Sequence, residues 1–153
     1  NVLDRLLYWN GATISPAPVG TQIRIENRGN GVPDTVVTRS SGLQRGRFLT
    51  PFNNRIGAAD STGDFHSDLS WFLEPNPGAD VGAYAVKLSL STSAPGIDDS
   101  PAFFVVQNFG LSTTAFENGV AAFAAIIPEP TTYTLLAIAA AALGVSRRRT
   151  PQR

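Results

Sequence analysis

The stretch Tyr84–Leu90 (YAVKLSL) alternates between two kinds of side chain along its whole length. The larger apolar side chains fall on one face of an extended chain, at Tyr84, Val86, Leu88 and Leu90. The other face carries only small or polar side chains, at Ala85, Lys87 and Ser89. Successive side chains of a β-strand point to opposite sides, so this period of two predicts a strand that is buried on one side.

Four other short segments have the composition of strands, namely Gln22–Glu26, Thr35–Thr38, Ser70–Leu73 and Phe103–Gln107. The last of them is apolar without alternation, which is typical of a strand covered on both faces. Val2–Trp9 fits either a strand or a helix. Turn-forming segments separate the strands, at Asn27–Asp34, Glu74–Asp80 and Ala94–Pro101. Short strands punctuated in this way predict a mainly β fold, a small antiparallel β-sandwich.

One helix is predicted after the last strand. Ser112, Thr113 or Thr114 can cap it, and Glu117 stands three residues after Thr114, which is the spacing of a capping box. Apolar side chains recur at three- and four-residue steps, at Phe116, Val120, Phe123 and Ile127. Pro128 ends the helix, because proline disfavours the α conformation in the residue before it.

The charge of the chain is unevenly distributed. The 153 residues carry twelve basic and twelve acidic side chains, which leaves room for one domain plus a tail and gives no net charge. Four of the basic residues lie in the last seven positions, at Arg147, Arg148, Arg149 and Arg153. The rest of the chain is therefore acidic, and it has no electrostatic reason to bind nucleic acid.

Two residue types are missing from the sequence. There is no cysteine, which excludes zinc–thiolate sites, disulfides and thiol nucleophiles. There is also no methionine, so we expect either that a leader has been removed or that the sequence is a fragment.

Polar residues that could carry chemistry lie in the connections. The acids cluster in two loops, at Asp60, Asp64 and Asp68 and at Asp98 and Asp99. They could bind Ca²⁺ or act as a carboxylate pair on glycosides, but aspartate also starts turns, and we favour that role. His66 is the only histidine and is expected to be solvated. We therefore predict no catalytic residue, no metal site and no cofactor, and hence no enzyme.

Five aromatic residues fall in or near the predicted strands, at Tyr8, Trp9, Trp71, Phe72 and Tyr84. They could form a stacking platform for a sugar. Aromatic side chains at strand positions more often belong to the core, and we favour that interpretation.

The segment Thr131–Ser146 contains no charged side chain and is rich in alanine and leucine. As a helix it would span roughly 24 Å, somewhat less than a bilayer core of about 30 Å. A buried core helix is the alternative. Arg147, Arg148 and Arg149 follow directly, and basic residues stay on the cytoplasmic side of a membrane. We predict a single C-terminal transmembrane helix over residues 131–146 with a basic cytoplasmic tail over residues 147–153.

The triplet Pro128-Glu129-Pro130 precedes this segment. Its two prolines fix φ on either side of Glu129 and remove two hydrogen-bond donors. The result is an extended segment that cannot join the helices around it, and a protease or transpeptidase needs its substrate extended. By itself, such a triplet is only a stiff linker.

The triplet, the apolar run and the arginines in this order resemble the PEP-CTERM sorting signal of Gram-negative bacteria, over about the last 26 residues. The resemblance implies recognition by exosortase, a membrane transpeptidase-like enzyme, and a link to exopolysaccharide and biofilm production. Pro128, Glu129 and Pro130 would be the recognised motif, and Arg147–Arg149 would orient the chain in the membrane.

These features predict an exported β-rich domain over residues 1–127, followed by the motif at 128–130, the membrane helix and the basic tail. We expect a cell-surface or extracellular-matrix protein, first held at the inner membrane with its body on the periplasmic side. Exosortase and the inner membrane are the expected partners, with exopolysaccharide as a further one. A carbohydrate-binding module with the same tag is the alternative, and a hydrolase would need a cleft with two converging carboxylates.

Overall fold

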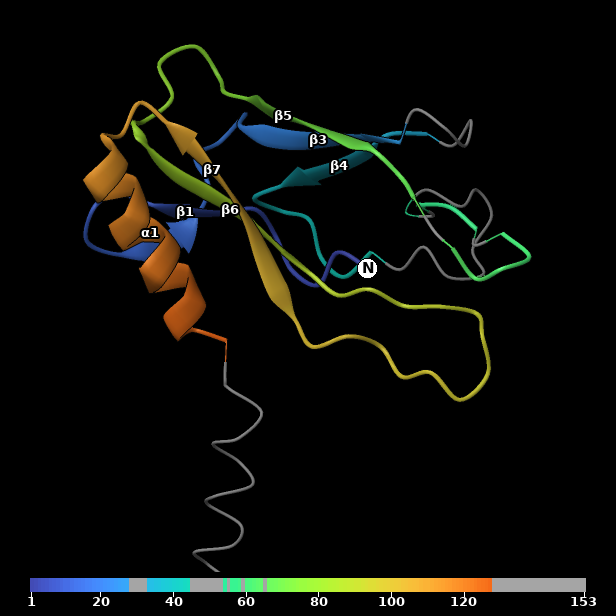
Figure 1. The fold of residues 1–153 in the computed structure, drawn as a ribbon. Coiled ribbons are helices and arrows are strands. Elements are labelled where there is room, and N and C mark those ends of the chain that lie inside the picture. The colour runs from blue at the N-terminus through green and yellow to red at the C-terminus, as the bar shows by residue number, and fades with distance from the viewer. Residues whose placement is uncertain (28–32, 45–53, 55, 59, 65, 128–153) are drawn as a thin grey trace, which may run out of the picture.

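The computed structural model describes residues 1–27, 33–44, 54, 56–58, 60–64 and 66–127 (Figure 1). The elements in these residues are β1 (Leu7–Trp9), β2 (Ile14–Pro16), β3 (Gln22–Asn27), β4 (Thr35–Thr38), β5 (Leu69–Glu74), β6 (Gly82–Leu88), β7 (Phe103–Phe109) and α1 (Thr113–Ala125). They form a four-stranded sheet in the order β2-β1-β6-β7 and a three-stranded sheet in the order β4-β3-β5. Every strand pair is antiparallel. The predicted mainly β fold with antiparallel sheets and one C-terminal helix is confirmed.

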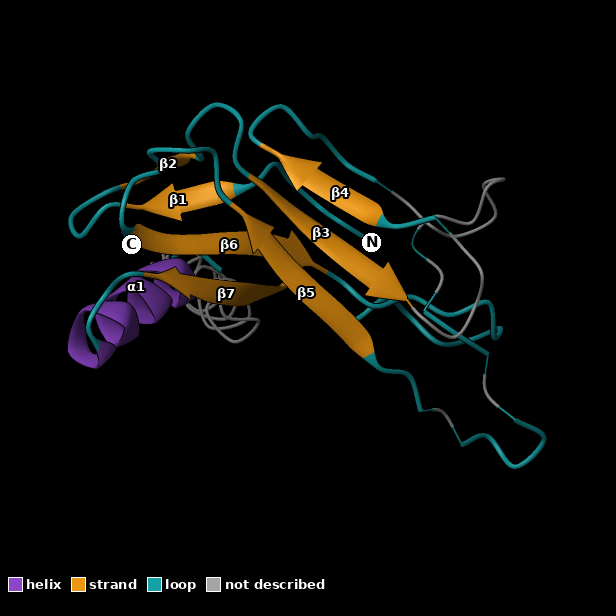
Figure 2. Cartoon of the chain, turned by 90° about the horizontal axis from the view of Figure 1, so that it is seen from above, coloured by secondary structure: helices purple, strands orange, loops and turns teal. Residues whose placement is uncertain are grey.

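The two sheets face each other across a shared core. The four-stranded side contributes Tyr8, Tyr84 and Val86, and the three-stranded side contributes Ile23, Ile25 and Val37. Ile23 and Ile25 alternate with polar residues of β3, so the strand keeps its apolar face toward the core. Figure 2 shows the three-stranded sheet crossing above the other at an angle.

The opposite face of the four-stranded sheet is covered by α1 (Figure 1). Trp9, Ala83, Ala85 and Phe123 form a second buried cluster there. Strand β6 is therefore buried on both faces, and the prediction of burial on one side only is wrong. The physical reason is that the alanines, which look like a weakly apolar outer face in sequence, give a helix room to approach the strand closely.

The predicted strand Tyr84–Leu90 begins and ends two residues earlier in the structure. Leu90 is 52% exposed, so its predicted burial is wrong. The main chain of Ser89 pairs with Asn1, through Asn1 N to Ser89 O at 2.8 Å and Ser89 N to Asn1 O at 3.1 Å. Beyond this point Leu90 N donates to the hydroxyl of Ser100 at 2.8 Å, and the chain leaves the sheet.

The first and last strands follow the sequence less closely. Val2–Trp9 is extended, with β1 at its end and an isolated bridge at Val2, so the strand alternative holds. In Phe103–Gln107 every side chain is half-buried and none is fully covered, because β7 is the last strand of its sheet. The predicted cover on both faces is present but incomplete.

Helix α1 begins at Ser112, whose Oγ accepts a hydrogen bond from Ala115 N at 3.4 Å. Since Ser112 is the cap, the third helical residue is Ala115, and the capping box proposed for Glu117 is wrong. The buried helical residues are Gly119 and Phe123, whereas Val120 is 39% exposed and does not face the core as predicted. The helix uses a glycine for close contact, and hydrophobic periodicity cannot detect this.

Among the residues that the structure describes, no helix is long and apolar enough to cross a membrane. The predicted transmembrane segment 131–146 and the basic tail 147–153 lie outside these residues. That prediction therefore stays a prediction.

Candidate functional site

The first candidate region is the point where the chain leaves the folded domain at the end of α1. A Cβ atom added to Gly119 would lie 2.9 Å from Cε3 of Trp9 and 3.0 Å from the Cβ of Ala83, so the helix backbone rests directly on the sheet. Phe123 is fully buried, and its ring centroid lies 5.3 Å from that of Phe104. These contacts fix α1 on the four-stranded sheet, almost up to its last turn.

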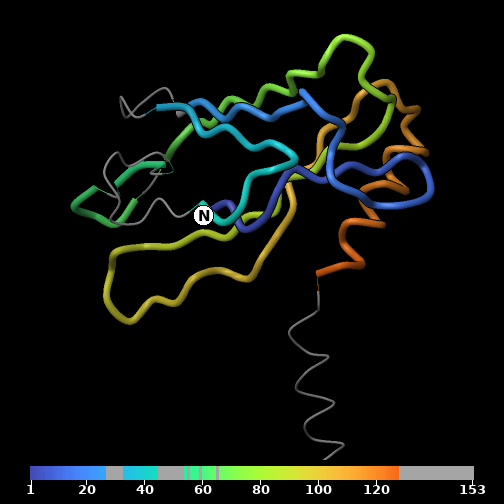
Figure 3. Tube along the Cα trace, turned by 180° about the vertical axis from the view of Figure 1, so that it is seen from behind, coloured from blue at the N-terminus to red at the C-terminus, as the bar shows by residue number. Residues whose placement is uncertain are grey.

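Helix α1 ends directly after the turn that contains Phe123. Ile126 N donates to Phe123 O at 3.3 Å, and Ile127 N donates to Ala124 O at 3.1 Å. Such three-residue bonds are common where an α-helix ends. Figures 1 and 3 show that this end of α1 points away from the three-stranded sheet. Whatever follows Ile127 therefore starts on the side of the domain remote from that sheet.

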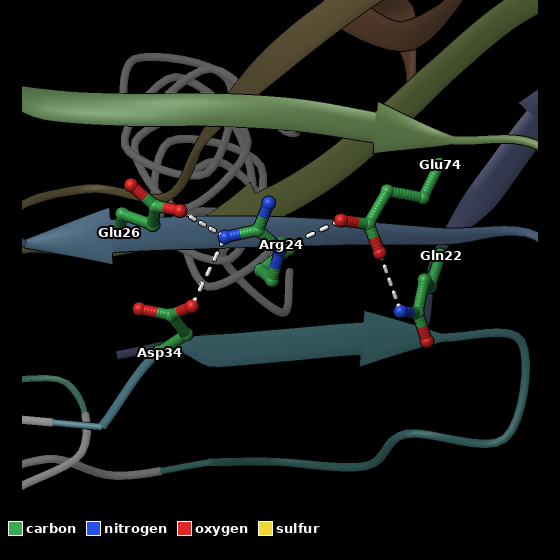
Figure 4. Close-up of polar contacts among 5 residues, drawn as sticks. All are labelled: Gln22, Arg24, Glu26, Asp34 and Glu74. Atoms are coloured by element: carbon green, nitrogen blue, oxygen red, sulfur yellow. Dashed lines mark hydrogen bonds and ion pairs between the residues drawn. The ribbon is translucent and has the colours of Figure 1, made fainter.

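A second region is a charged cluster on the outer face of the three-stranded sheet, shown in Figure 4. Arg24 of β3 donates from Nε to Glu74 of β5 at 2.6 Å and lies 3.1 Å from Asp34, which precedes β4. It also pairs with Glu26. Glu74 accepts a further hydrogen bond from Gln22 at 2.6 Å.

Arg24 is the basic residue that the three carboxylates of this cluster share. Hydrogen bonds from Gln22 and Arg24 lower the pKa of Glu74. The hydrogen bonds to Glu74, Glu26 and Asp34 in turn raise the pKa of Arg24. The guanidinium also lies 4.5 Å above the ring of Phe72. Such an arrangement holds β3, β5 and the start of β4 in register, and it engages its carboxylates in ion pairs.

This cluster was not predicted from the sequence. The only signal is the polar series Gln22, Arg24 and Glu26, which alternates with Ile23 and Ile25 along β3.

In the first of the two acidic loops, the carboxylate of Asp60 stabilises a turn. Oδ1 of Asp60 accepts hydrogen bonds from the hydroxyl of Thr62 at 2.6 Å and from the backbone N–H groups of Thr62 at 2.8 Å and Asp64 at 3.0 Å, and these hydrogen bonds lower the pKa of Asp60. The turn role favoured for Asp60 is confirmed. The side chain of His66 is 89% exposed and lies 3.5 Å from Asp68, so its predicted solvation is confirmed. No group of three or more potential metal ligands occurs within the described part of the chain.

The five aromatic residues do not share a surface. Tyr8, Trp9 and Tyr84 are buried, as the core interpretation predicts. Trp71 and Phe72 are half-buried and consecutive on β5, so their side chains point to opposite faces. Trp71 packs toward the core, and Phe72 lies under Arg24 on the outside.

A third region is a pocket of about 170 Å³ between the two sheets. Its apolar wall includes side chains from both sheets, at Ile25, Leu69, Trp71, Leu88, Phe103 and Val105. No carboxylate belongs to the lining formed by the described residues. This pocket is suited to an apolar group, and it lacks the converging acids that glycoside hydrolysis needs.

In the sequence, the docked helix α1 is followed directly by the proline triplet, the apolar run and the arginines, an order of segments that is typical of C-terminal sorting signals. Residues 127–149 match the family model described as the PEP-CTERM protein-sorting motif. The chain therefore carries a PEP-CTERM sorting signal, and such a signal implies an exported protein that exosortase processes. Comparison with curated proteins and with solved structures gives no match.

The predicted site residues fall inside the matched segment, namely Pro128, Glu129, Pro130, Arg147, Arg148 and Arg149. All of them lie outside the described residues. What the structure adds is the position of α1, the helix that precedes them, which ends at Ala125 and is docked through Phe123.

Proposed function

We propose that this chain is a non-enzymatic cell-surface or extracellular-matrix protein of a biofilm, associated with exopolysaccharide. In this proposal the inner membrane holds the chain through residues 131–146 until exosortase processes it. One observation carries the proposal: the sorting motif starts at residue 127, directly after a helix that is packed onto the β domain. In this proposal the domain and the motif are separate parts of the chain.

The proposed topology follows from the position of the basic residues. Arg147, Arg148 and Arg149 stay in the cytoplasm, which leaves residues 1–127 on the periplasmic side. After processing near Pro128-Glu129-Pro130, the body moves to the cell surface or the medium.

The assignment as a non-enzyme is supported by the state of the polar residues. The carboxylates of Glu26, Asp34 and Glu74 contact Arg24, and that of Asp60 holds a turn. The pocket between the sheets has an apolar wall. Among the described residues, neither region offers a nucleophile beside a base, which hydrolytic mechanisms require.

A carbohydrate-binding module is the second candidate. It could draw on the half-buried Trp71 and Phe72, but these side chains lie on opposite faces of β5 and cannot stack on one sugar. We therefore favour the non-enzymatic surface or matrix protein over the carbohydrate-binding module.

The test uses the full chain in a host that has exosortase and in the same host without it. Intact mass and an epitope after Arg153 report processing. We expect a shortened product without the epitope in the first host and full-length protein in the membrane fraction of the second. Equal processing in both hosts would contradict the proposal.

A further inference from the structure

Strand β7 presents an open edge that differs from the other sheet edges in the described chain. It contains seven residues, Phe103–Phe109, with no charge and no proline, and within these residues it pairs only with β6. The remaining edges are shorter: β2 has three residues and ends in Pro16, β4 has four, and β5 has six and ends in the engaged Glu74. Proteins usually protect an edge by shortness, charge or proline, and β7 has none of these.

Both faces of β7 carry apolar side chains that are only half covered. Phe104 and Val106 pack against the cluster under α1. Phe103 and Val105, on the other face, line the pocket between the sheets together with Trp71 of β5. The pocket therefore lies along the same strand as the open edge. In Figure 2, β7 is the outermost strand of its sheet.

We propose that β7 pairs antiparallel with β7 of a second copy of this chain, which joins two four-stranded sheets into one continuous sheet. A strand added at an edge gains main-chain hydrogen bonds, and pockets beside the edge accept alternate side chains. A two-fold arrangement of this kind uses the same surface on both copies and closes on itself.

The faces of β7 restrict the register of this pairing. Side chains at odd positions face the pocket and side chains at even positions face α1, so odd positions must lie opposite odd positions. Full overlap of the seven residues then centres the pair on Val106. Phe103 of each copy lies opposite Phe109 of the other, and Val105 lies opposite Gln107.

This register also accounts for the pocket. Phe109 of the second copy, opposite Phe103, would lie beside the pocket and cover its apolar wall. The strand carries no charge, so no like charges meet across the interface, and the apolar Phe103 and Val106 lie opposite Phe109 and Val106 of the second copy. A free apolar molecule in the pocket is the competing outcome of the test.

The experiment measures the mass of the purified full chain in a mild non-ionic detergent as a function of protein concentration. We expect a dimer, and we expect Gln107→Lys to weaken it at least about tenfold, because a lysine at an edge opposes strand pairing. Val36→Lys is the matched control, since it adds the same charge to the edge strand β4 at a residue that is 37% exposed. A monomeric wild type, or a dimer that Gln107→Lys leaves intact, overturns the proposal.

A cysteine pair tests the register without adding charge, because the chain contains no cysteine. In the proposed dimer Val106→Cys lies opposite itself and is expected to form a disulfide-linked dimer. Two Val105→Cys residues would be diagonal neighbours about 7–8 Å apart, which is too far for a disulfide, so this variant is the control. Equal or faster cross-linking of Val105→Cys overturns the register. A monomer whose binding of an apolar dye is lost in Trp71→Ala shows that the pocket takes a free molecule instead, and overturns the dimer.

Discussion

Arg24 and Glu74 lie fifty positions apart in the sequence and form a 2.6 Å hydrogen bond across β3 and β5. The bond joins two neighbouring strands on the outer face of the three-stranded sheet, directly over Ile23 and Ile25 on the inner face. Polar contacts outside the core thus reinforce a register that the core itself selects.

Acidification should weaken the fold through Glu74. Its pKa is lower in the folded state than the ordinary value of 4.5, because Gln22 and Arg24 hydrogen-bond to the charged form. The charged carboxylate therefore contributes stability above the unfolded pKa, and this contribution is lost as the pH falls through the lowered folded pKa. We expect Glu74→Gln to show a shallower loss of Tm between pH 5 and pH 3 than the wild type. Glu117→Gln, on the exposed side of α1, is the control and should follow the wild type.

Alkaline conditions should weaken the fold through Tyr84. Burial raises the pKa of Tyr84 from 10.0 to about 12, and its hydroxyl donates to Asp80 O at 2.7 Å. Because its pKa is raised on folding, the folded state favours the protonated form of Tyr84. The contribution of this form to the stability of the fold is complete below pH 10 and is lost as the pH rises toward 12. Tyr84→Phe should cost about 1 kcal/mol at neutral pH through the lost hydrogen bond, and it should remove part of this alkaline loss. Urea unfolding at neutral pH and at alkaline pH measures the two effects. A Tyr84→Phe variant that loses stability with rising pH as steeply as the wild type would show that Tyr84 does not cause the alkaline loss.

Gly119 should resist even the smallest substitution. Alanine is a better helix former than glycine by about 1 kcal/mol, but a Cβ here would press on Trp9 and Ala83. We expect Gly119→Ala to gain nothing and Gly119→Leu to lose about 1–3 kcal/mol or more through overpacking. Ala121→Leu on the exposed side of α1 should stay within about 0.5 kcal/mol. Denaturant unfolding measures the free energy of unfolding of each variant. A Gly119→Leu variant that is more stable than the wild type would show that α1 does not rest on the sheet.

Replacing Pro128-Glu129-Pro130 by three alanines should stop processing. Without the prolines, helix can continue from α1 toward residue 131, and the extended substrate that a transpeptidase needs is lost. We expect full-length precursor to accumulate in cells that contain exosortase. Glu117→Ala, an acidic-to-alanine change within α1, is the control for general effects on export. Processing of the triple variant at the normal rate would exclude these residues as the recognised motif.

The orientation of the tail can be read with a reporter fused after Arg153. In the proposed topology the three arginines at 147–149 keep their end of the apolar segment in the cytoplasm. A reporter that is active only in the periplasm should therefore stay silent, while one that is active in the cytoplasm should work. Replacing the three arginines by glutamines should weaken this preference. Periplasmic activity of the unchanged fusion would reverse the proposed topology.

Local patterns predicted the strands well where the side chains themselves decide the structure. Thr35–Thr38 is β-branched at every position and coincides with β4, and Gln22–Glu26 is extended by one residue in β3. The same patterns failed where a distant segment decides. Leu90 continues the alternation in sequence, yet Ser89 pairs with Asn1 and the strand ends before it.

The candidate sites divide in the same way. The sorting motif is contiguous, so its residues could be identified from the sequence, and residues 127–149 match the family model. The pocket and the Arg24 cluster combine residues from strands that are far apart in the chain, such as Leu69 with Phe103 and Arg24 with Glu74. Which strands pair, and in which register, must be known before such sites can be predicted.

The docked end of α1 sets a very short tether between the domain and its motif. Only Ile126 and Ile127 separate Ala125 from Pro128, and three residue steps of fully extended chain span about 10 Å. While Pro128 is bound, the folded body cannot withdraw farther than this from the enzyme unless α1 unwinds. An enzyme that binds this chain at Pro128 must therefore accommodate the folded β domain close to its binding site.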